Sequence, residues 1–189
     1  MAFERYKTKE SVVVVFTGEG KGKTSASIGL MARALGNGWR VAFVQFIKHW
    51  EVSEHVFIKQ IQPLYEKKLF FYKGGKGFYN AGDLSAKDVT LEEHKLAAEL
   101  TLKTAMKCAS SGEYDLVICD EINNAVNDHL LKTSDLKQLI LKRHPKTSLC
   151  LTGRNFKFEL LDLVDIATDM KKLTHHFDKN FLANKGIDY

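Results

Sequence analysis

The amino-acid sequence contains no long hydrophobic run. None of its 189 residues lies in a stretch that approaches the roughly 18 to 20 apolar residues needed to span a bilayer. Residues 1–10 are charged and lack the apolar core of a signal peptide, so we expect them to form a flexible N-terminus. These absences predict a cytoplasmic protein with no membrane partner.

Cysteine is scarce, and its spacing suggests no pairing. Cys108, Cys119 and Cys150 are odd in number and far apart, and no two of them have zinc-finger or redox-motif spacing. Two of them lie in apolar, strand-like runs. We therefore expect buried thiols in a reducing cytoplasm.

The excess of one charge sign is also small. The 28 Lys and Arg residues stand against 23 Asp and Glu residues, a formal net charge of +5, and the basic residues are spread along the chain. The sequence has no dense basic or aromatic stripe of the kind that binds single-stranded nucleic acid. A solvated basic surface with a phosphate site is therefore expected, and no nucleic-acid partner.

What the sequence does have is a globular composition, with 44% hydrophobic and 27% charged residues. Its length suits one domain over residues 1–189. Continuous apolar runs predict buried strands, and helical spacing predicts helices between them. The expected strands cover residues 12–16, 40–47, 116–119, 148–152 and 166–168, and the expected helices 25–35, 90–112, 134–142 and 158–163. This alternation predicts an α/β fold, a mostly parallel sheet flanked by helices on both faces.

Residues 48–88 are harder to assign. They hold a short apolar piece at residues 69–72 and then a glycine-rich segment with two lysines at residues 73–77. Long loops inside compact domains are commonly lids or binding segments. We expect a lysine-bearing lid at residues 73–77, whose glycines let it close over substrate.

The most informative segment, GEGKGKT at residues 18–24, follows the first expected strand. The usual phosphate loop reads G-x-x-x-x-G-K-[ST]; its backbone N–H groups wrap the phosphates, its lysine adds a charge and its hydroxyl binds Mg²⁺. Gly22, Lys23 and Thr24 match the end of this pattern, but the opening glycine is Gly18, where the pattern would place it at Thr17. A strand before the loop, a helix after it and two lysines within it predict a nucleoside triphosphate site in a P-loop NTPase-like (RecA-like) fold.

Asp120 and Glu121 follow the expected strand 116–119. In a parallel sheet the carboxyl end of such a strand lies beside the phosphate loop, where ligands bind in open α/β folds. A carboxylate there can hold Mg²⁺ directly or through water. The loop and the carboxylates therefore support each other as one nucleotide site.

Four blocks of the sequence together resemble the P-loop-type ATP:corrinoid adenosyltransferases, which act on cob(I)yrinic acid a,c-diamide or cob(I)alamin. The blocks are residues 18–24, 44–48, 114–123 and 151–154, the last with the tail 175–189. They run over nearly the whole chain, and the displaced glycine at position 18 is typical of this family.

The resemblance implies transfer of the 5′-deoxyadenosyl group of ATP to the cobalt(I) centre of a corrinoid, in cobalamin biosynthesis or salvage. Cobalt(I) is a strong nucleophile that attacks the ribose C5′, so the leaving group is the entire triphosphate. Loop N–H groups, Lys23 and Mg²⁺ (or Mn²⁺) would stabilise the charge that grows on it. The resemblance also implies a homodimer and a cobalt-reducing flavoprotein or similar donor.

The same resemblance assigns roles by position. Lys23 and Glu121 would be catalytic, and Thr24, Glu121 and Asp120 would be metal ligands. The residues expected to bind ATP are Gly18, Glu19, Gly20, Lys21, Gly22, Lys23, Thr24, Ser25, Arg33, Arg154 and His175. Without the resemblance, His175 and His176 would be surface residues and no metal pair, because adjacent side chains on a strand or helix do not converge.

The expected corrinoid contacts depart from the family pattern Gly-Phe-x-Trp. Here the segment reads Gly77, Phe78, Tyr79 and Asn80, with asparagine in place of the tryptophan. Phe78, Tyr79 and Asn80 are the expected corrinoid contacts. A lone aromatic in a glycine-rich loop could equally anchor that loop to the core, and both readings of Phe78 stay open.

Two other functions also stay open. A P-loop small-molecule kinase or ATPase would need a hydroxyl-bearing acceptor and would release ADP. An ATP-dependent carrier would deliver the corrinoid to another protein. The position of Gly18 and the C-terminal block argue against the kinase, whereas nothing in the sequence excludes delivery as an added role.

Overall fold

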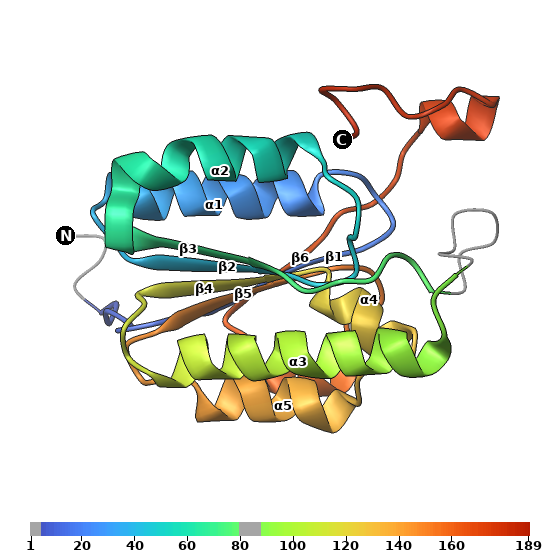
Figure 1. Ribbon diagram of the computed structural model, residues 1–189. Coiled ribbons are helices and arrows are strands. Elements are labelled where there is room, and N and C mark those ends of the chain that lie inside the picture. Colours follow the sequence, from blue (N-terminus) through green and yellow to red (C-terminus); the bar gives the residue numbers. More distant parts are fainter. Residues whose placement is uncertain (1–4, 80–87) are drawn as a thin grey trace.

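The computed structural model describes residues 5–79 and 88–189. They form a six-stranded sheet with the strand order β3-β2-β4-β5-β1-β6, and every neighbouring pair is parallel (Figure 1). The strands are β1 (Val13–Thr17), β2 (Val41–Gln45), β3 (Leu69–Lys73), β4 (Leu116–Asp120), β5 (Ser148–Thr152) and β6 (Ile166–Asp169). The predicted α/β fold is confirmed.

Helices cover both faces of this sheet. Figure 1 shows α1 (Lys23–Gly36) and α2 (Ser53–Tyr65) on one face, and α3 (Leu91–Ser110) and α5 (Thr133–Lys142) on the other. The short helix α4 (Ile122–Asn127) begins directly after β4. The 3-10 helices are η1 (Glu66–Lys68), η3 (Phe158–Leu163) and η4 (His176–Lys179). No described helix is both long enough and apolar enough to cross a membrane.

The central strands are buried on both faces, which confines their polar residues to the ends. Val41 and Phe43 of β2 belong to the core under α1 and α2, whereas Ala42 and Val44 belong to the core under α3 and α5. Burying one such side chain stabilises the fold by roughly 1.5–3 kcal/mol for Val or Phe. In β2 and β4 a polar side chain appears only at the carboxyl end of the strand, as Gln45 in β2 and Asp120 in β4.

Residues 48–79 hold more regular structure than the sequence predicted. Helix α2 was missed because only His55 and Ile58 are buried along it, so its apolar spacing is weak, and because Pro63 lies inside it. The apolar piece at residues 69–72 is part of β3, which pairs in parallel with β2. Helix α4 was missed because it is only six residues long.

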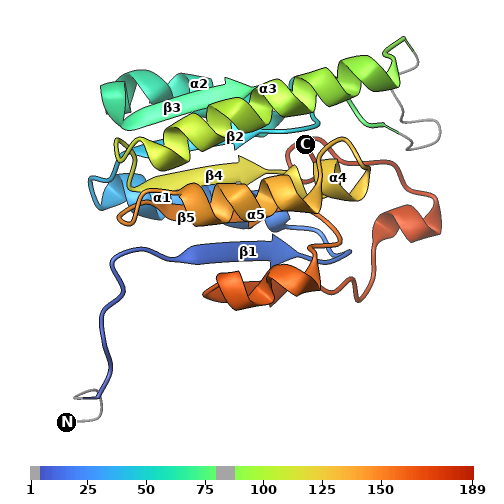
Figure 2. The same cartoon turned by 90° about the horizontal axis from the view of Figure 1, so that it is seen from below.

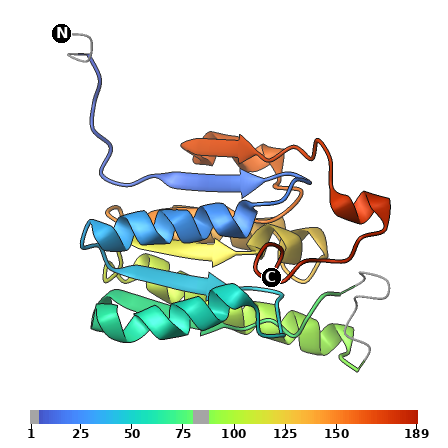
Figure 3. The same ribbon diagram turned by 90° about the horizontal axis from the view of Figure 1, so that it is seen from above.

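The segment that precedes β1 and the tail that follows β6 lie at opposite ends of the strands. Residues 5–10 are exposed and extend away from β1 (Figure 2). The tail that follows β6 runs past the carboxyl ends of the strands (Figure 3). Cys108, Cys119 and Cys150 are free and buried, as predicted.

Candidate active site

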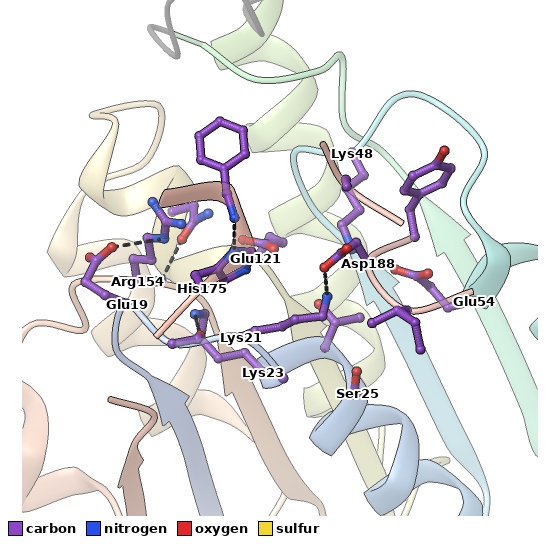
Figure 4. Close-up of a pocket in the computed structure, with 18 of the residues that line it drawn as sticks. Glu19, Lys21, Lys23, Ser25, Lys48, Glu54, Glu121, Arg154, His175 and Asp188 are labelled. Atoms are coloured by element: carbon purple, nitrogen blue, oxygen red, sulfur yellow. Dashed lines mark hydrogen bonds and ion pairs between the residues drawn. The ribbon is translucent and has the colours of Figure 1, made fainter. Parts of the chain in front are cut away.

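A cleft of about 1120 Å³ opens at the carboxyl ends of the strands. Its walls come from the loop at residues 18–24, which we call the glycine loop, and from the segments that follow β2, β4 and β5. The first turn of α2 and the C-terminal tail complete it. Figure 4 shows Arg154, Glu19 and His175 on one side of this site, and Lys48, Glu54 and Asp188 on the other.

The displaced glycine of the loop has a packing reason. A Cβ atom on Gly18 would overlap the Asp169 carboxylate and the Met170 backbone, and one on Gly20 would overlap the Met170 carbonyl. The Gly20 N–H donates to that carbonyl at 2.5 Å. Gly18 also has a φ of 98°, a left-handed conformation that favours glycine. The end of β6 therefore requires glycine at these two positions of the loop.

Lys23 lies inside the curve of the glycine loop. Its ammonium group donates to the carbonyl oxygens of Gly18 at 2.6 Å and of Gly20 at 2.7 Å. Burial lowers the pKa of Lys23, and the nearby carboxylates of Glu121 and Glu19 oppose that shift. Because α1 begins at this residue, its helix dipole adds partial positive charge at the same point. The arrangement suits a ligand with several negative charges.

The Asp120 carboxylate, at the end of β4, connects β2, β5 and the glycine loop through hydrogen bonds. It is fully buried at the end of β4. Its Oδ2 atom accepts from the Thr24 hydroxyl at 3.0 Å and from the Gln45 amide at 2.9 Å, and its Oδ1 atom accepts from the Thr152 hydroxyl at 2.6 Å. Gln45 is its register partner on β2. The parallel topology thus places this carboxylate beside the glycine loop.

Glu121 has a buried carboxylate oxygen without a hydrogen-bond partner, Oε2. Its backbone is left-handed with a φ of 65°, and its N–H donates to the Thr152 hydroxyl at 2.9 Å. Burial, together with the charge of Asp120, raises the pKa of Glu121 to about 7. An orphaned carboxylate oxygen near a hydroxyl and a second carboxylate fits a hard divalent cation.

The donors at this point are two carboxylates and one hydroxyl, those of Asp120, Glu121 and Thr24. Within residues 5–79 and 88–189, no three His, Cys, Asp or Glu side chains gather to hold a metal ion. A nucleotide-bound Mg²⁺ needs only one or two protein carboxylates, because phosphates and waters supply its other ligands. The residues present therefore fit Mg²⁺ that arrives with a nucleotide.

Arg154 and His175 line the cleft, whereas Arg33 does not. The Arg154 N–H donates to the Asn124 side chain at 2.6 Å, and its guanidinium lies 3.4 Å from the Glu19 carboxylate. Arg33 is exposed in the last turn of α1, about 15 Å along the helix axis from Lys23 at 1.5 Å per residue. The cleft geometry gives no support to a nucleotide contact at Arg33.

The histidine pair departs from expectation. The ring centroids of His175 and His176 lie 4.7 Å apart, so the prediction that these side chains would not converge is wrong. The rule applies to regular strands and helices, and His175 precedes the 3-10 helix η4 in an extended conformation. The Nδ1 atom of His175 accepts from the Phe177 N–H at 3.1 Å, which holds the ring at the cleft.

An aromatic group forms another wall of the cleft. Phe78 and Tyr79 line it, and the Phe78 ring packs on Trp50 with centroids 5.0 Å apart. The Tyr79 ring packs on His94 at 5.6 Å. Phe78 is therefore anchored to Trp50 and also lines the cleft, and its contact with a corrinoid stays a prediction. Asn80, the third expected corrinoid contact, lies outside the described residues.

The glycine-rich segment at residues 73–77 is fixed to the end of β2. The Gly74 N–H donates to the Gln45 carbonyl at 3.1 Å, and the Gly77 N–H donates to the Ile47 carbonyl at 2.7 Å. A Cβ atom on Gly75 would overlap the Ile47 backbone. Close packing explains these glycines, for which the sequence predicted a closing lid.

The sequence assigned no individual role to three residues that line the cleft, Lys48, Glu54 and Asp188. The Lys48 ammonium pairs with the Glu54 carboxylate at 2.7 Å, and the Lys21 ammonium pairs with the Asp188 carboxylate at 2.8 Å. Lys48 had a usable signal, since it is a charged residue just beyond a strand that pairs with β4. Asp188 lies in the block 175–189 that carries the resemblance, but nothing local in the sequence shows that the tail returns to the loop.

The parallel sheet, the loop between β1 and α1 and the carboxylate at the end of β4 define an α/β protein of the P-loop NTPase-like class. The chain belongs to the family described as ATP:corrinoid adenosyltransferase BtuR/CobO/CobP, whose sequence profile matches residues 9–189. It is similar to the corrinoid adenosyltransferase of Pseudomonas aeruginosa, with 28% identity over 97% of this chain and 86% of that protein. It is 29% identical to the Escherichia coli K12 corrinoid adenosyltransferase and to Salmonella typhimurium corrinoid adenosyltransferase CobA, in each case over 96% of this chain and 87% of the relative.

Proposed function

We propose that this chain transfers the 5′-deoxyadenosyl group of ATP to the cobalt(I) centre of a corrinoid and releases triphosphate. Membership of the adenosyltransferase family supports this activity. The observation that supports it most directly is the composition of one cleft. One end of the cleft has Lys23, Thr24 and Glu121, which suit an anion and a metal ion, and another wall is formed by the aromatic residues Phe78 and Tyr79. The first end suits a triphosphate, and the second suits a large, flat ring system.

The transfer step requires stabilisation of a leaving group. The cobalt(I) electron pair forms the cobalt–carbon bond at C5′, and the C5′–O bond breaks with its electron pair passing to the triphosphate. No proton moves in this step, so the chain needs no general base. In the proposal, Lys23 exchanges the Gly18 and Gly20 carbonyls for phosphate oxygens, and the loop N–H groups bind the same anion. Loss of one such donor commonly lowers kcat by about 10²–10³-fold.

Thr24, Asp120 and Glu121 would hold Mg²⁺ (or Mn²⁺) in this proposal. The ion supplies positive charge to the triphosphate when it is bound. The unpartnered Oε2 atom of Glu121 supports its role as a ligand. Asp120 is occupied by Gln45 and Thr152 as well as Thr24, so its part is to orient the Thr24 hydroxyl and to bind the ion through water.

The proposal extends to partners that the reaction needs. Cobalt(I) must be supplied by a reductant, for which a flavoprotein or similar donor in the cytoplasm is the proposed partner. A homodimer is proposed as well, since Phe181 and Leu182 of the tail are 64% and 81% exposed and offer apolar surface that a second copy would cover. A kinase or ATPase is not favoured by the family match, whereas corrinoid delivery to another protein is compatible with it as an added role.

The proposal is tested by product analysis. The protein is mixed with ATP, Mg²⁺ and a corrinoid reduced to cobalt(I), and the visible spectrum is followed while the phosphate products are separated. A cobalt–carbon bond with one triphosphate per corrinoid supports the proposal, and ADP with phosphate refutes it. Lys23→Ala should reduce the rate by at least 10²-fold while the circular dichroism spectrum stays that of wild type. Arg33→Ala, which removes a cation of the same helix outside the cleft, should leave the affinity for ATP unchanged.

A further inference from the structure

Strand β2 ends in a strained turn at Ile47. This residue has a φ of 59°, a conformation that β-branched residues rarely adopt. The Lys48 N–H donates across it to the Phe46 carbonyl at 2.6 Å, which makes a three-residue turn of the rare, positive-φ kind. Such backbone strain persists only where the surroundings hold it, and it concentrates at ligand-binding sites.

The surroundings that hold this turn come from the glycine-rich segment. The Gly77 N–H donates to the Ile47 carbonyl, and Gly75 packs so closely on the Ile47 backbone that a Cβ atom would overlap it. The Ile47 side chain is itself buried in the core. Gly75, Gly77 and the buried Ile47 side chain thus hold the turn at Ile47 in place. This turn sets the direction of the next residue, Lys48.

Lys48 is directed into the cleft. Its side chain is only 13% exposed, and its ammonium group lies 2.7 Å from the Glu54 carboxylate in the first turn of α2. Burial acts to lower the pKa of Lys48, but the carboxylates of Asp120 and Glu54 outweigh burial, so the pKa is raised and the side chain stays charged. Figure 4 shows Lys48 and Lys23 extending from different sides of the site.

The position of Lys48 indicates the ligand it would meet, because Lys48 lines the same cleft as Lys21 and Lys23 of the glycine loop. Asp120 and Glu121 both act on its ammonium group, and Asp120 is bonded to Thr24 of the glycine loop. Lys48 therefore faces, from the side opposite Lys23, the cleft in which the loop would hold phosphates. An ion pair that only attached α2 to the sheet would need no strained backbone at Ile47.

We propose that Lys48 is a further cation of the triphosphate site, one that rests on Glu54 in the free protein and contacts phosphate oxygens in the complex. The identity of the ligand as a linear triphosphate rests on the proposed function. In the transfer step, Lys48 stabilises the negative charge that the breaking C5′–O bond adds to the triphosphate. It acts on the leaving group and makes no contact with the corrinoid.

The test is calorimetric titration of the full chain with inorganic tripolyphosphate, with EDTA present and no corrinoid. Lys48→Met keeps the length of the side chain and removes its charge, and it should weaken binding at least 10-fold. Lys48→Arg should restore part of that loss. Lys59→Met is the matched control, because Lys59 pairs with Glu51 at the surface and does not line the cleft.

Glu54→Gln separates the proposal from a structural ion pair. It breaks the same Lys48–Glu54 contact and keeps the cation, so it should bind tripolyphosphate as tightly as wild type or more tightly. Equal weakening by Lys48→Met and Glu54→Gln would show that the pair only attaches α2 and would overturn the proposal. Wild-type binding by Lys48→Met would overturn it too. If Lys48→Met does not fold, Glu54→Gln decides, because weakened binding there contradicts the proposal and retained binding supports it.

Adenosyl transfer measured in parallel separates this proposal from the proposed function. If the wild type forms no cobalt–carbon bond but Lys48→Met weakens tripolyphosphate binding, the proposed function fails and the Lys48 site stands. If the wild type is active and Lys48→Met binds as wild type does, Lys48 alone has been assigned wrongly.

Discussion

Two glycines of the glycine loop are required by close packing against β6, a requirement that the phosphate-loop sequence pattern does not include. Gly18 and Gly20 each lie against the end of β6, where any side chain would meet Asp169 or Met170. Thr17 is still part of β1, and its hydroxyl accepts from the Phe156 N–H at 3.1 Å. The opening glycine therefore stands at the first position after the strand, where the chain meets β6.

Gly20→Ala should disturb the loop without removing any charged group. Its Cβ atom would overlap the Met170 carbonyl, so the loop or β6 must shift, at a cost of about 1–3 kcal/mol in unfolding free energy. Gly29→Ala is the control, because it lies in α1 with open space around it, and it should stabilise the protein by up to about 1 kcal/mol. Urea denaturation measures both. Equal stability of the two variants would contradict the packing explanation.

His55 is a buried titratable residue connected to the site through Gln45. It is 1% exposed, its Nε2 atom lies 3.4 Å from the Gln45 Oε1 atom, and the Gln45 amide in turn donates to Asp120. Burial lowers the pKa of His55 to about 4, with opposition from Glu54. In the folded protein His55 is therefore neutral over the whole physiological range of pH.

Stability should fall with acid because of His55. Above pH 6.5, the pKa of His55 in the unfolded chain, His55 is neutral in both the folded and the unfolded protein, and its contribution to the unfolding free energy is fully present. As the pH falls from 6.5 towards 4, His55 binds a proton in the unfolded chain but not in the folded protein, so the folded protein loses stability. The unfolding free energy should drop by about 2 kcal/mol between pH 7 and pH 5 from this residue. His55→Gln should remove that part of the pH dependence. Parallel curves of urea midpoint against pH for the two proteins would show that the His55 assignment is wrong.

At the scale of elements, the C-terminal tail is attached to the glycine loop by an ion pair. Lys21 pairs with Asp188 at 2.8 Å, and the same carboxylate accepts from the Asn184 N–H at 2.7 Å. Ile187 beside it is 70% exposed, so the apolar burial that holds this stretch is small. A phosphate arriving at Lys21 would compete with Asp188.

Asp188→Asn should therefore strengthen the binding of tripolyphosphate by up to about fivefold, since ion pairs near the surface contribute little. Glu51→Gln is the matched control, because it breaks the surface ion pair with Lys59 outside the cleft and leaves Lys21 paired. Titration of the three proteins gives the comparison. Weaker binding by Asp188→Asn would mean that the tail carboxylate helps to hold the ligand.

The elements that the sequence predicted are those with a strong local pattern. β1, β2, β4 and β5 are continuous apolar runs, and α3 begins at a capping box that the structure contains, with the Glu93 N–H donating to the Thr90 hydroxyl. α2 and β3 have half-buried faces and were not assigned, although the first turn of α2 lines the cleft.

The site residues that could be predicted from the sequence are those with a recognisable chemical role that stand at the end of a strand or just after it. Lys23, Thr24 and Asp120 follow from the loop pattern and from parallel topology, and the structure brings them together. The contact of Lys21 with Asp188 depends on how distant segments pack, and the contact of Lys48 with Glu54 depends on the turn between β2 and α2, so the sequence pattern predicted neither contact. Arg33 shows the reverse case, a residue suggested by resemblance that the fold places outside the cleft.

At the scale of the whole molecule, parallel topology builds the cleft. Gln45, Asp120 and Thr152 stand at the carboxyl ends of three neighbouring strands, and the glycine loop follows a fourth, so the polar groups meet at one edge of an otherwise apolar sheet. The loop is thus placed to hold an anion at one end of a cleft whose other wall is aromatic. This division underlies the central claim, that carbon and not phosphorus is attacked.

Oxygen labelling tests that claim directly. ATP carrying ¹⁸O in the bridge between C5′ and the α-phosphorus is incubated with the protein, Mg²⁺ and a cobalt(I) corrinoid, and the phosphate products are analysed by mass spectrometry. We expect the label to leave in intact triphosphate, one per cobalt–carbon bond formed, because the C5′–O bond is the one that breaks. Label retained on a nucleoside diphosphate, with unlabelled phosphate released or transferred, would contradict it.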